Sequence, residues 1–134
     1  MVRSIIITGA SKGIGRATAD ALVEDGWSVI GVARSSPTNF PGVFIEADLA
    51  DREKTQDLAD DLIARGNVLG IINNVGLARH ERVDAVDPDV FAMVMDLNVR
   101  PAPCNSVSLE QSARQRRRGP VFEQSAHAAI RASE

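Results

Sequence analysis

A glycine-rich segment directly after a short aliphatic run is the strongest constraint on the fold of this chain. Residues 8–15 read T-G-A-S-K-G-I-G, and three isoleucines occupy positions 5–7. A strand that enters such a turn and continues into a helix can hold a pyrophosphate. The backbone turns tightly, no Cβ blocks the phosphates, and the helix N-terminus offers N–H donors. The segment therefore predicts a dinucleotide-binding strand–loop–helix unit.

Strand and helix patterns alternate through the first hundred residues. Aliphatic runs predict strands at 5–7, 28–33, 43–45 and 68–72. Helical patterns cover 16–25, 51–65 and the segment that begins at Asp87 and Pro88, and Gly26 and Gly66 are expected to end the first two helices. This alternation favours an α/β fold with a parallel sheet.

Apolar residues at helical spacing predict which face of each helix is buried. The expected inward residues are Ala17, Ala21 and Leu22 in the first helix, Leu58, Ala59, Leu62 and Ile63 in the second, and Phe91, Val94, Met95 and Asn98 or its neighbours in the third.

The composition changes after residue 100. Residues 101–134 contain only five of Val, Leu, Ile and Phe, which is below the fraction that usually supports a packed core. We therefore expect residues 1–100 to form a dinucleotide-binding half-domain and residues 101–134 to form a divergent, poorly ordered tail.

Bulk properties exclude several kinds of partner. The net charge is −3, and no aromatic residue is interleaved with Arg114 or with the arginines at 116–118, so nucleic acid is not expected as a partner. No apolar run is long enough for a membrane span, and one cysteine with two histidines predicts no metal site. The expected location is the cytoplasm.

Four motifs in register resemble those of the short-chain dehydrogenase/reductase family, over about residues 3–100. They are the glycine loop, Asp48-Leu49 after the third strand, N-N-V-G at 73–76 after the fourth, and L-N-V at 97–99. The resemblance implies a Rossmann-type doubly wound sheet and an NAD(P)-dependent oxidoreductase acting on carbonyl or alcohol substrates. It implies cofactor contacts from Gly9, Ser11, Lys12, Gly13, Ile14, Gly15, Arg34, Asp48, Leu49, Asn73, Asn74 and Gly76, and it makes Asn98 a member of the catalytic tetrad.

Some of these residues have a second interpretation. Asp48 lies at the carboxyl edge of a strand, where it can accept a hydrogen bond from an adenine amine, but it can also cap the helix that begins near Asp51. Asn73 and Asn74 can bond a ribose and the neighbouring backbone, or can serve only the turn.

The end of the second strand favours NADP(H) over NAD(H). The position at which NAD-binding sites place an acidic residue holds Ala33, and Arg34 follows it. Arg34 can donate two hydrogen bonds to a 2′-phosphate, a charge-assisted interaction that contributes about 1.5–3 kcal/mol. Lys12 adds a second cation, as in NADP-preferring family members. The alternative is that both side chains are only solvated.

The family's proton-transfer residues are missing. The chain has no tyrosine, its only lysines are Lys12 and Lys54, and no serine can be assigned to the tetrad. Asn98 alone catalyses nothing, because no other residue type supplies the phenol's proton. We therefore expect a truncated or frameshifted member, inactive alone, whose other reading frames encode Y-x-x-x-K. The alternative is a non-catalytic dinucleotide-binding module. A methyltransferase with a similar fold is a further alternative, but it would need an acidic residue at the end of the second strand, where Ala33 and Arg34 stand.

A truncated family sheet, with strands in the order 3-2-1-4, would leave its fourth strand as an open edge. Ile71 and Ile72 are expected to point to opposite faces. An apolar open edge can pair with another chain, so we expect self-association through it.

Overall fold

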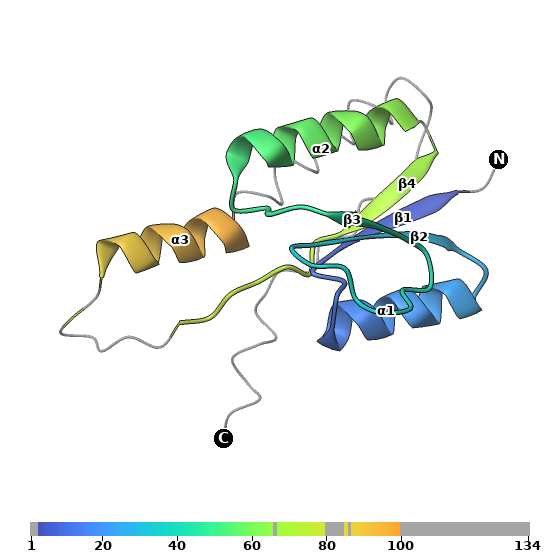
Figure 1. Ribbon diagram of the computed structural model, residues 1–134, viewed down its shortest axis with the longest axis horizontal. Helices are drawn as coiled ribbons and strands as arrows, with labels where there is room; N and C mark the ends of the chain where they lie inside the picture. Colours follow the sequence, from blue (N-terminus) through green and yellow to red (C-terminus); the bar gives the residue numbers. More distant parts are fainter. Residues whose placement is uncertain (1–2, 66, 80–84, 86, 100–134) are drawn as a thin grey trace.

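A computed structural model describes residues 3–65, 67–79, 85 and 87–99 (Figure 1). The elements are β1 (Ser4–Thr8), α1 (Gly13–Glu24), β2 (Ser28–Ala33), β3 (Val43–Glu46), α2 (Arg52–Arg65), β4 (Val68–Ile72) and α3 (Pro88–Asn98). Within the described residues, the four strands are parallel and form one sheet in the order β3-β2-β1-β4. Helices α1 and α2 cover opposite faces of the sheet, and α3 lies beyond the strand ends (Figure 1). The predicted fold class and strand order are confirmed.

The core consists of two layers on either side of the central strand β1, whose residues are all buried. Ile6 packs toward α2 with Leu62 and Leu49, while Ile5 and Ile7 pack toward α1 with Ala19. Successive side chains of a strand point to opposite faces, so an unbroken isoleucine run is what a strand covered on both sides requires. Full burial of each such side chain contributes about 1.5–3 kcal/mol.

The same alternation appears at β4. Ile71 belongs to the core layer under α2, and Ile72 packs against the layer under α1. The expectation that these two residues face opposite ways is therefore confirmed. Within the described residues, β4 pairs only with β1, so its other edge is the open one.

Helix α1 begins at Gly13, earlier than the predicted Arg16, because the Arg16 N–H already donates to the carbonyl of the N-cap residue Lys12 at 3.4 Å. It ends at Glu24, one residue before the predicted end, and Gly26 follows the C-cap residue Asp25 as predicted, with a φ of +86° in the left-handed region that favours glycine. The Gly26 N–H donates to the Val23 carbonyl at 3.0 Å, and the Trp27 N–H donates to the Leu22 carbonyl at 2.9 Å. This pair of bonds is a Schellman motif and satisfies the last carbonyls of the helix.

The predicted buried face of α1 is partly wrong. Ala17 and Ala21 are exposed, whereas Gly15 and Ala19 are buried and Leu22 packs against the core. Gly15 and Ala19 are one turn apart and have the smallest side chains, so they let the helix approach the sheet closely. In α2, the inward positions of Leu58, Ala59 and Leu62 are confirmed. The Ile63 side chain and Gly66 lie outside the described residues.

Helix α3 starts as predicted, since the Asp87 carboxylate accepts from the Asp89 N–H at 2.9 Å. The predicted burial of Phe91 and Met95 is wrong, because they are 58% and 41% exposed. Val94 and Asn98 are half-buried. The helix extends past the strand ends, where no described element covers its outer face (Figure 1).

Two further predictions concern the remainder of the chain. The segment 101–134, with its expected disorder, lies outside the described residues. In the described ranges, no helix has the length and apolar character needed to cross a membrane, and no group of His, Cys, Asp or Glu side chains is placed to hold a metal ion.

The start of α2 generates a prediction about acid stability. The Lys54 N–H donates to Asp51 Oδ1 at 3.2 Å, and the Lys54 ammonium lies 3.3 Å from Oδ2. These interactions, the backbone bond foremost, hold the pKa of the Asp51 carboxyl below its ordinary value of 3.8. A lowered folded-state pKa stabilises the fold above the unfolded-state pKa, and that stabilisation is lost as the pH falls through the folded value.

Asp51→Asn keeps an acceptor at the helix start but does not titrate there. Its urea midpoint should therefore fall less steeply than that of the wild type below about pH 4. Asp57→Asn, at an exposed position of the same helix, is the control. Identical slopes for wild type and Asp51→Asn would contradict the role of this cap.

Candidate dinucleotide-binding site

The glycine loop joins the carboxyl end of β1 to the first turn of α1, and its three glycines meet different requirements. Gly9 and Gly13 have φ values of +69° and +58°, so both adopt left-handed backbone. A Cβ on Gly15 would overlap the Gly9 carbonyl oxygen, so this glycine allows the helix to pack onto the loop. A Cβ on Gly13 would meet no atom within 4 Å, so the backbone here faces open space.

The N-terminus of α1 has the properties of an anion site. The N-cap residue, Lys12, makes no side-chain capping bond, and the first turn contains no acidic residue. The first N–H groups of a helix have no partner within the helix, and the helix dipole adds partial positive charge there. The local geometry therefore has what pyrophosphate binding requires.

A hydrogen-bonded joint connects the loop after β1 to the loop after β4. The buried Thr8 hydroxyl accepts from the N–H groups of Asn74 and Val75 at 3.0 and 3.1 Å, and it donates to the Ile72 carbonyl at 3.4 Å. In return, Asn74 Nδ2 donates to the carbonyls of Thr8 and Gly9 at 3.2 and 3.3 Å. The predicted backbone role of Asn74 is confirmed, and its contact with a ribose stays a prediction.

Asn73, the residue before this joint, presents a different situation. Its side chain is buried, and within the described residues neither Oδ1 nor Nδ2 has a hydrogen-bond partner. An unsatisfied buried polar group costs about 1–3 kcal/mol. A bond from a cofactor, as the sequence predicts, would offset this cost, and that contact stays a prediction.

Asn98, the predicted tetrad member, holds the chain that follows β4. Its Oδ1 accepts from the Leu77 N–H at 2.6 Å, and its Nδ2 donates to the Leu77 carbonyl at 2.8 Å. The side chain therefore ties the end of α3 to the segment after the N-N-V-G motif. This is a positioning contact, and a catalytic role stays a prediction.

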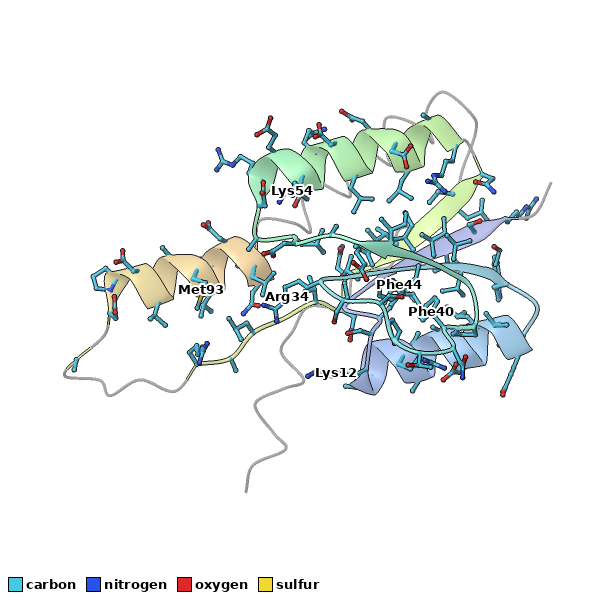
Figure 2. All side chains as sticks on the ribbon, in the orientation of Figure 1. Lys12, Arg34, Phe40, Phe44, Lys54 and Met93 are labelled. Carbon is cyan, nitrogen blue, oxygen red and sulfur yellow. The ribbon has the colours of Figure 1, made fainter. Side chains whose placement is uncertain are left out.

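Two cations lie at the sheet edge where β1 and β2 end (Figure 2). Lys12 and Arg34 are both exposed, and in the described part of the chain neither forms an ion pair. Ala33 ends β2 without a carboxylate. The arrangement leaves both charges available to an anion.

Asp48 and Leu49 play different parts after β3. The Asp48 carboxylate is exposed and accepts from the Ala50 N–H at 3.0 Å, while the cap of α2 is Asp51. The alternative interpretation of Asp48 as the helix cap is therefore wrong, because Asp51 is adjacent to the first helical residue. Leu49 is only 4% exposed and belongs to the core, so an adenine contact would have to come from its backbone.

The other predicted contact residues also lie in these loops. Ser11 is half-buried, Gly76 is exposed, and Ile14 is 65% exposed at the start of α1. The sequence reasoning missed the Thr8 hydroxyl, although its place as the last residue of a buried strand was a usable signal. It also missed Arg16 and Glu46, whose partners are distant in sequence.

The fold and the glycine loop define a Rossmann-type α/β domain. The family model for short chain dehydrogenases matches residues 3–129, which is further than the region that carried the resemblance. The chain therefore belongs to the short chain dehydrogenase family.

Relatives and solved structures agree with this assignment. The chain is 34% identical over 112 residues to the NADPH-dependent pterin aldehyde reductase of Arabidopsis thaliana, covering 73% of this chain and 46% of that protein. It is 30% identical over 128 residues to dehydrogenase/reductase SDR family member 11 of Gallus gallus, covering 85% and 50%. A short-chain dehydrogenase structure from Streptomyces avermitilis superimposes with a TM-score of 0.82 and 29% identity, over 92% of this chain and 49% of that one. The chain thus spans about half the length of the relatives it matches.

The joint between the two loops generates a stability prediction. Thr8→Val keeps the shape of the side chain but removes the acceptor of two N–H groups, so the free energy of unfolding should fall by about 1–3 kcal/mol. Thr8→Ser keeps the hydroxyl and should lose about 1 kcal/mol at most, from the missing methyl group. Urea denaturation measures both. A Thr8→Val protein as stable as Thr8→Ser would contradict the role of the hydroxyl.

Proposed function

We propose that this chain binds NADP(H) at the carboxyl edge of its sheet, in preference to NAD(H). The observation that supports the preference most directly is the end of β2, where Ala33 replaces a carboxylate and exposed Arg34 follows. An acidic residue here would repel a 2′-phosphate, whereas a guanidinium can bind it with two parallel hydrogen bonds.

The residues present fit a dinucleotide. Gly13 faces open space, α1 begins without a side-chain cap, and Lys12 and Arg34 offer two cations. In the proposed complex, the glycine loop holds the pyrophosphate and Arg34 with Lys12 holds the 2′-phosphate, while Asp48 receives the adenine amine. In an active member of the family, the nicotinamide of this cofactor would supply or accept a hydride. The relative from Arabidopsis thaliana is named as NADPH-dependent, which supports the same preference.

For the family, the corresponding reaction is hydride transfer between this cofactor and a carbonyl or alcohol. The 134-residue chain contains no tyrosine, and both lysines lie in its first half, at positions 12 and 54. It therefore lacks a phenol to donate the proton that accompanies the hydride. We propose that the chain, by itself, binds the cofactor without turnover. In this interpretation the chain is an inactive form of an oxidoreductase. The alternative is that the chain is a non-catalytic module whose function is to bind a dinucleotide.

The remaining expectations belong to the same proposal. Residues 1–100 would form the cofactor-binding half-domain and residues 101–134 a distinct segment, in a cytoplasmic protein. The outer edge of β4 would allow self-association, because an unpaired strand presents free N–H and C=O groups. Neither nucleic acid nor a membrane is proposed as a partner.

Calorimetric titration tests the cofactor preference. Arg34→Ala should raise the dissociation constant for NADPH by about ten- to a hundredfold, because a charge-assisted interaction is lost, and should leave that for NADH nearly unchanged. Arg3→Ala removes an exposed arginine at the opposite end of β1 and is the matched control. A similar loss of affinity for both cofactors in Arg34→Ala would contradict the assigned role.

A separate assay tests the lack of turnover. Purified wild-type chain mixed with NADPH and a panel of aldehydes and ketones should show no oxidation of the reduced nicotinamide above the protein-free rate. Oxidation proportional to the protein concentration and reduced in Arg34→Ala would overturn the proposal, since a contaminating enzyme would not respond to that substitution.

A further inference from the structure

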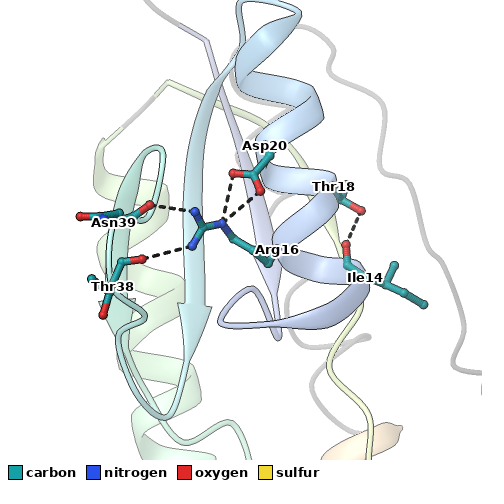
Figure 3. A network of polar contacts seen from close by, with 6 residues as sticks. All are labelled: Ile14, Arg16, Thr18, Asp20, Thr38 and Asn39. Atoms are coloured by element: carbon teal, nitrogen blue, oxygen red, sulfur yellow. Dashed lines mark hydrogen bonds and ion pairs between the residues drawn. The ribbon is translucent and has the colours of Figure 1, made fainter.

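Arg16 directly follows the glycine loop, but its side chain contacts a different loop of the protein. It lies in the first turn of α1, and its guanidinium reaches the loop that joins β2 to β3 (Figure 3). Nη2 donates to the Asn39 carbonyl at 2.8 Å, and Nη1 donates to the Thr38 carbonyl at 3.4 Å. Nε lies 3.1 and 3.2 Å from the two carboxylate oxygens of Asp20, one turn along the helix. One side chain therefore connects two segments that are more than twenty residues apart.

The loop at 34–42 is held at other points too. The Ser36 N–H donates to Glu46 Oε1 at 2.9 Å, which ties the loop to the end of β3. The Phe40 ring lies over Gly31 of β2 and meets the Phe44 ring edge-on, with centroids 5.0 Å apart. The Arg16 guanidinium lies 5.8 Å from the centre of the Phe40 ring, so it covers that ring as well.

Arg16 is suited to this task by its shape. A planar guanidinium has five N–H donors in a fixed fork, so it can bind two successive carbonyls and a carboxylate at once, whereas a lysine ammonium offers a single point of charge. Asn39 adopts left-handed backbone, with φ of 57°, next to these bonds. The contacts of Arg16 therefore favour one backbone conformation of the loop at 34–42.

The consequence concerns Lys12 and Arg34. Lys12 directly precedes α1, and Arg34 is the first residue of the loop, so their relative placement depends on how α1 and the loop are joined. We infer that Arg16 is a positioning residue, which holds the loop at 34–42 in the conformation that binds nucleotides with a phosphate on the 2′-oxygen. The inference rests on the proposed NADP(H) function and adds a residue that determines the preference without contacting the ligand.

Two nucleotides that lack nicotinamide isolate this effect, adenosine 2′,5′-bisphosphate and AMP. Arg16→Ala should weaken binding of the bisphosphate by about two- to tenfold, because the loop and Arg34 must then be ordered upon binding, while AMP binding stays nearly unchanged. Arg16→Lys should behave like Arg16→Ala, since it keeps the charge but not the fork. Arg65→Ala is the matched control, because Arg65 forms the same kind of pair with Asp61 in α2, at 2.9 Å.

A second readout needs no ligand. Hydrogen exchange in peptides that span 35–42 should be faster in Arg16→Ala and Arg16→Lys than in the wild type, and unchanged in Arg65→Ala. Should Arg16→Ala fail to fold, as judged by circular dichroism, Arg16→Lys and Asp20→Asn replace it in both measurements.

The outcomes separate the inference from the proposed function. If wild-type protein binds neither nucleotide, the proposed function fails and the inference fails with it. If wild type prefers the bisphosphate and the Arg16 variants keep that preference, only the inference is overturned. Equal weakening of both nucleotides, full rescue by Arg16→Lys, or unchanged exchange of the loop would also overturn it.

Discussion

The site depends on the hydrogen-bonded joint between the ends of β1 and β4. Beyond the last residues of a sheet, backbone groups lose their ladder partners and must find others. Here the Thr8 hydroxyl and the Asn74 side chain satisfy the groups of two loops at once. Gly15 packs against the Gly9 carbonyl and beside Asn74, so the start of α1 is placed by the same joint. The threonine and the asparagine of this joint therefore help to place the helix N-terminus, together with the packing of Ala19 against the sheet.

Two further contacts extend this joint around the carboxyl edge of the sheet. Asn98 clamps the backbone of Leu77, which holds the chain after β4 to α3. Arg16 clamps the loop after β2 to the first turn of α1. In each case a side chain with several donors or acceptors binds backbone groups of a distant segment. Hydrogen bonds are directional, so these contacts fix the backbone path of each loop. Apolar packing is not directional and would not fix that path by itself.

Much of the fold could be predicted, because strands buried on both faces need unbroken apolar runs and helix ends need particular residues. The isoleucines at 5–7, Gly26 after α1 and Asp87 before α3 all behave as their chemistry requires. Helical spacing was a weaker guide. It identified an apolar stripe in α3, but burial also needs a covering partner, and Phe91 and Met95 have none among the described residues. In α1 it selected Ala17 instead of Ala19, because the pattern alone does not set the rotation of a helix against a sheet.

The amino-acid sequence alone determined three properties of this protein. They are the strand–glycine loop–helix unit, the absence of a carboxylate at the end of β2 and the lack of a phenol for proton transfer. These properties need only neighbours along the chain or a count of residue types. Folding alone decided that Thr8 meets Asn74, that Arg16 meets Thr38 and Asn39, and that Leu49 turns into the core. The partners in these contacts are distant along the chain or are backbone carbonyls, which every residue possesses and which no sequence pattern distinguishes.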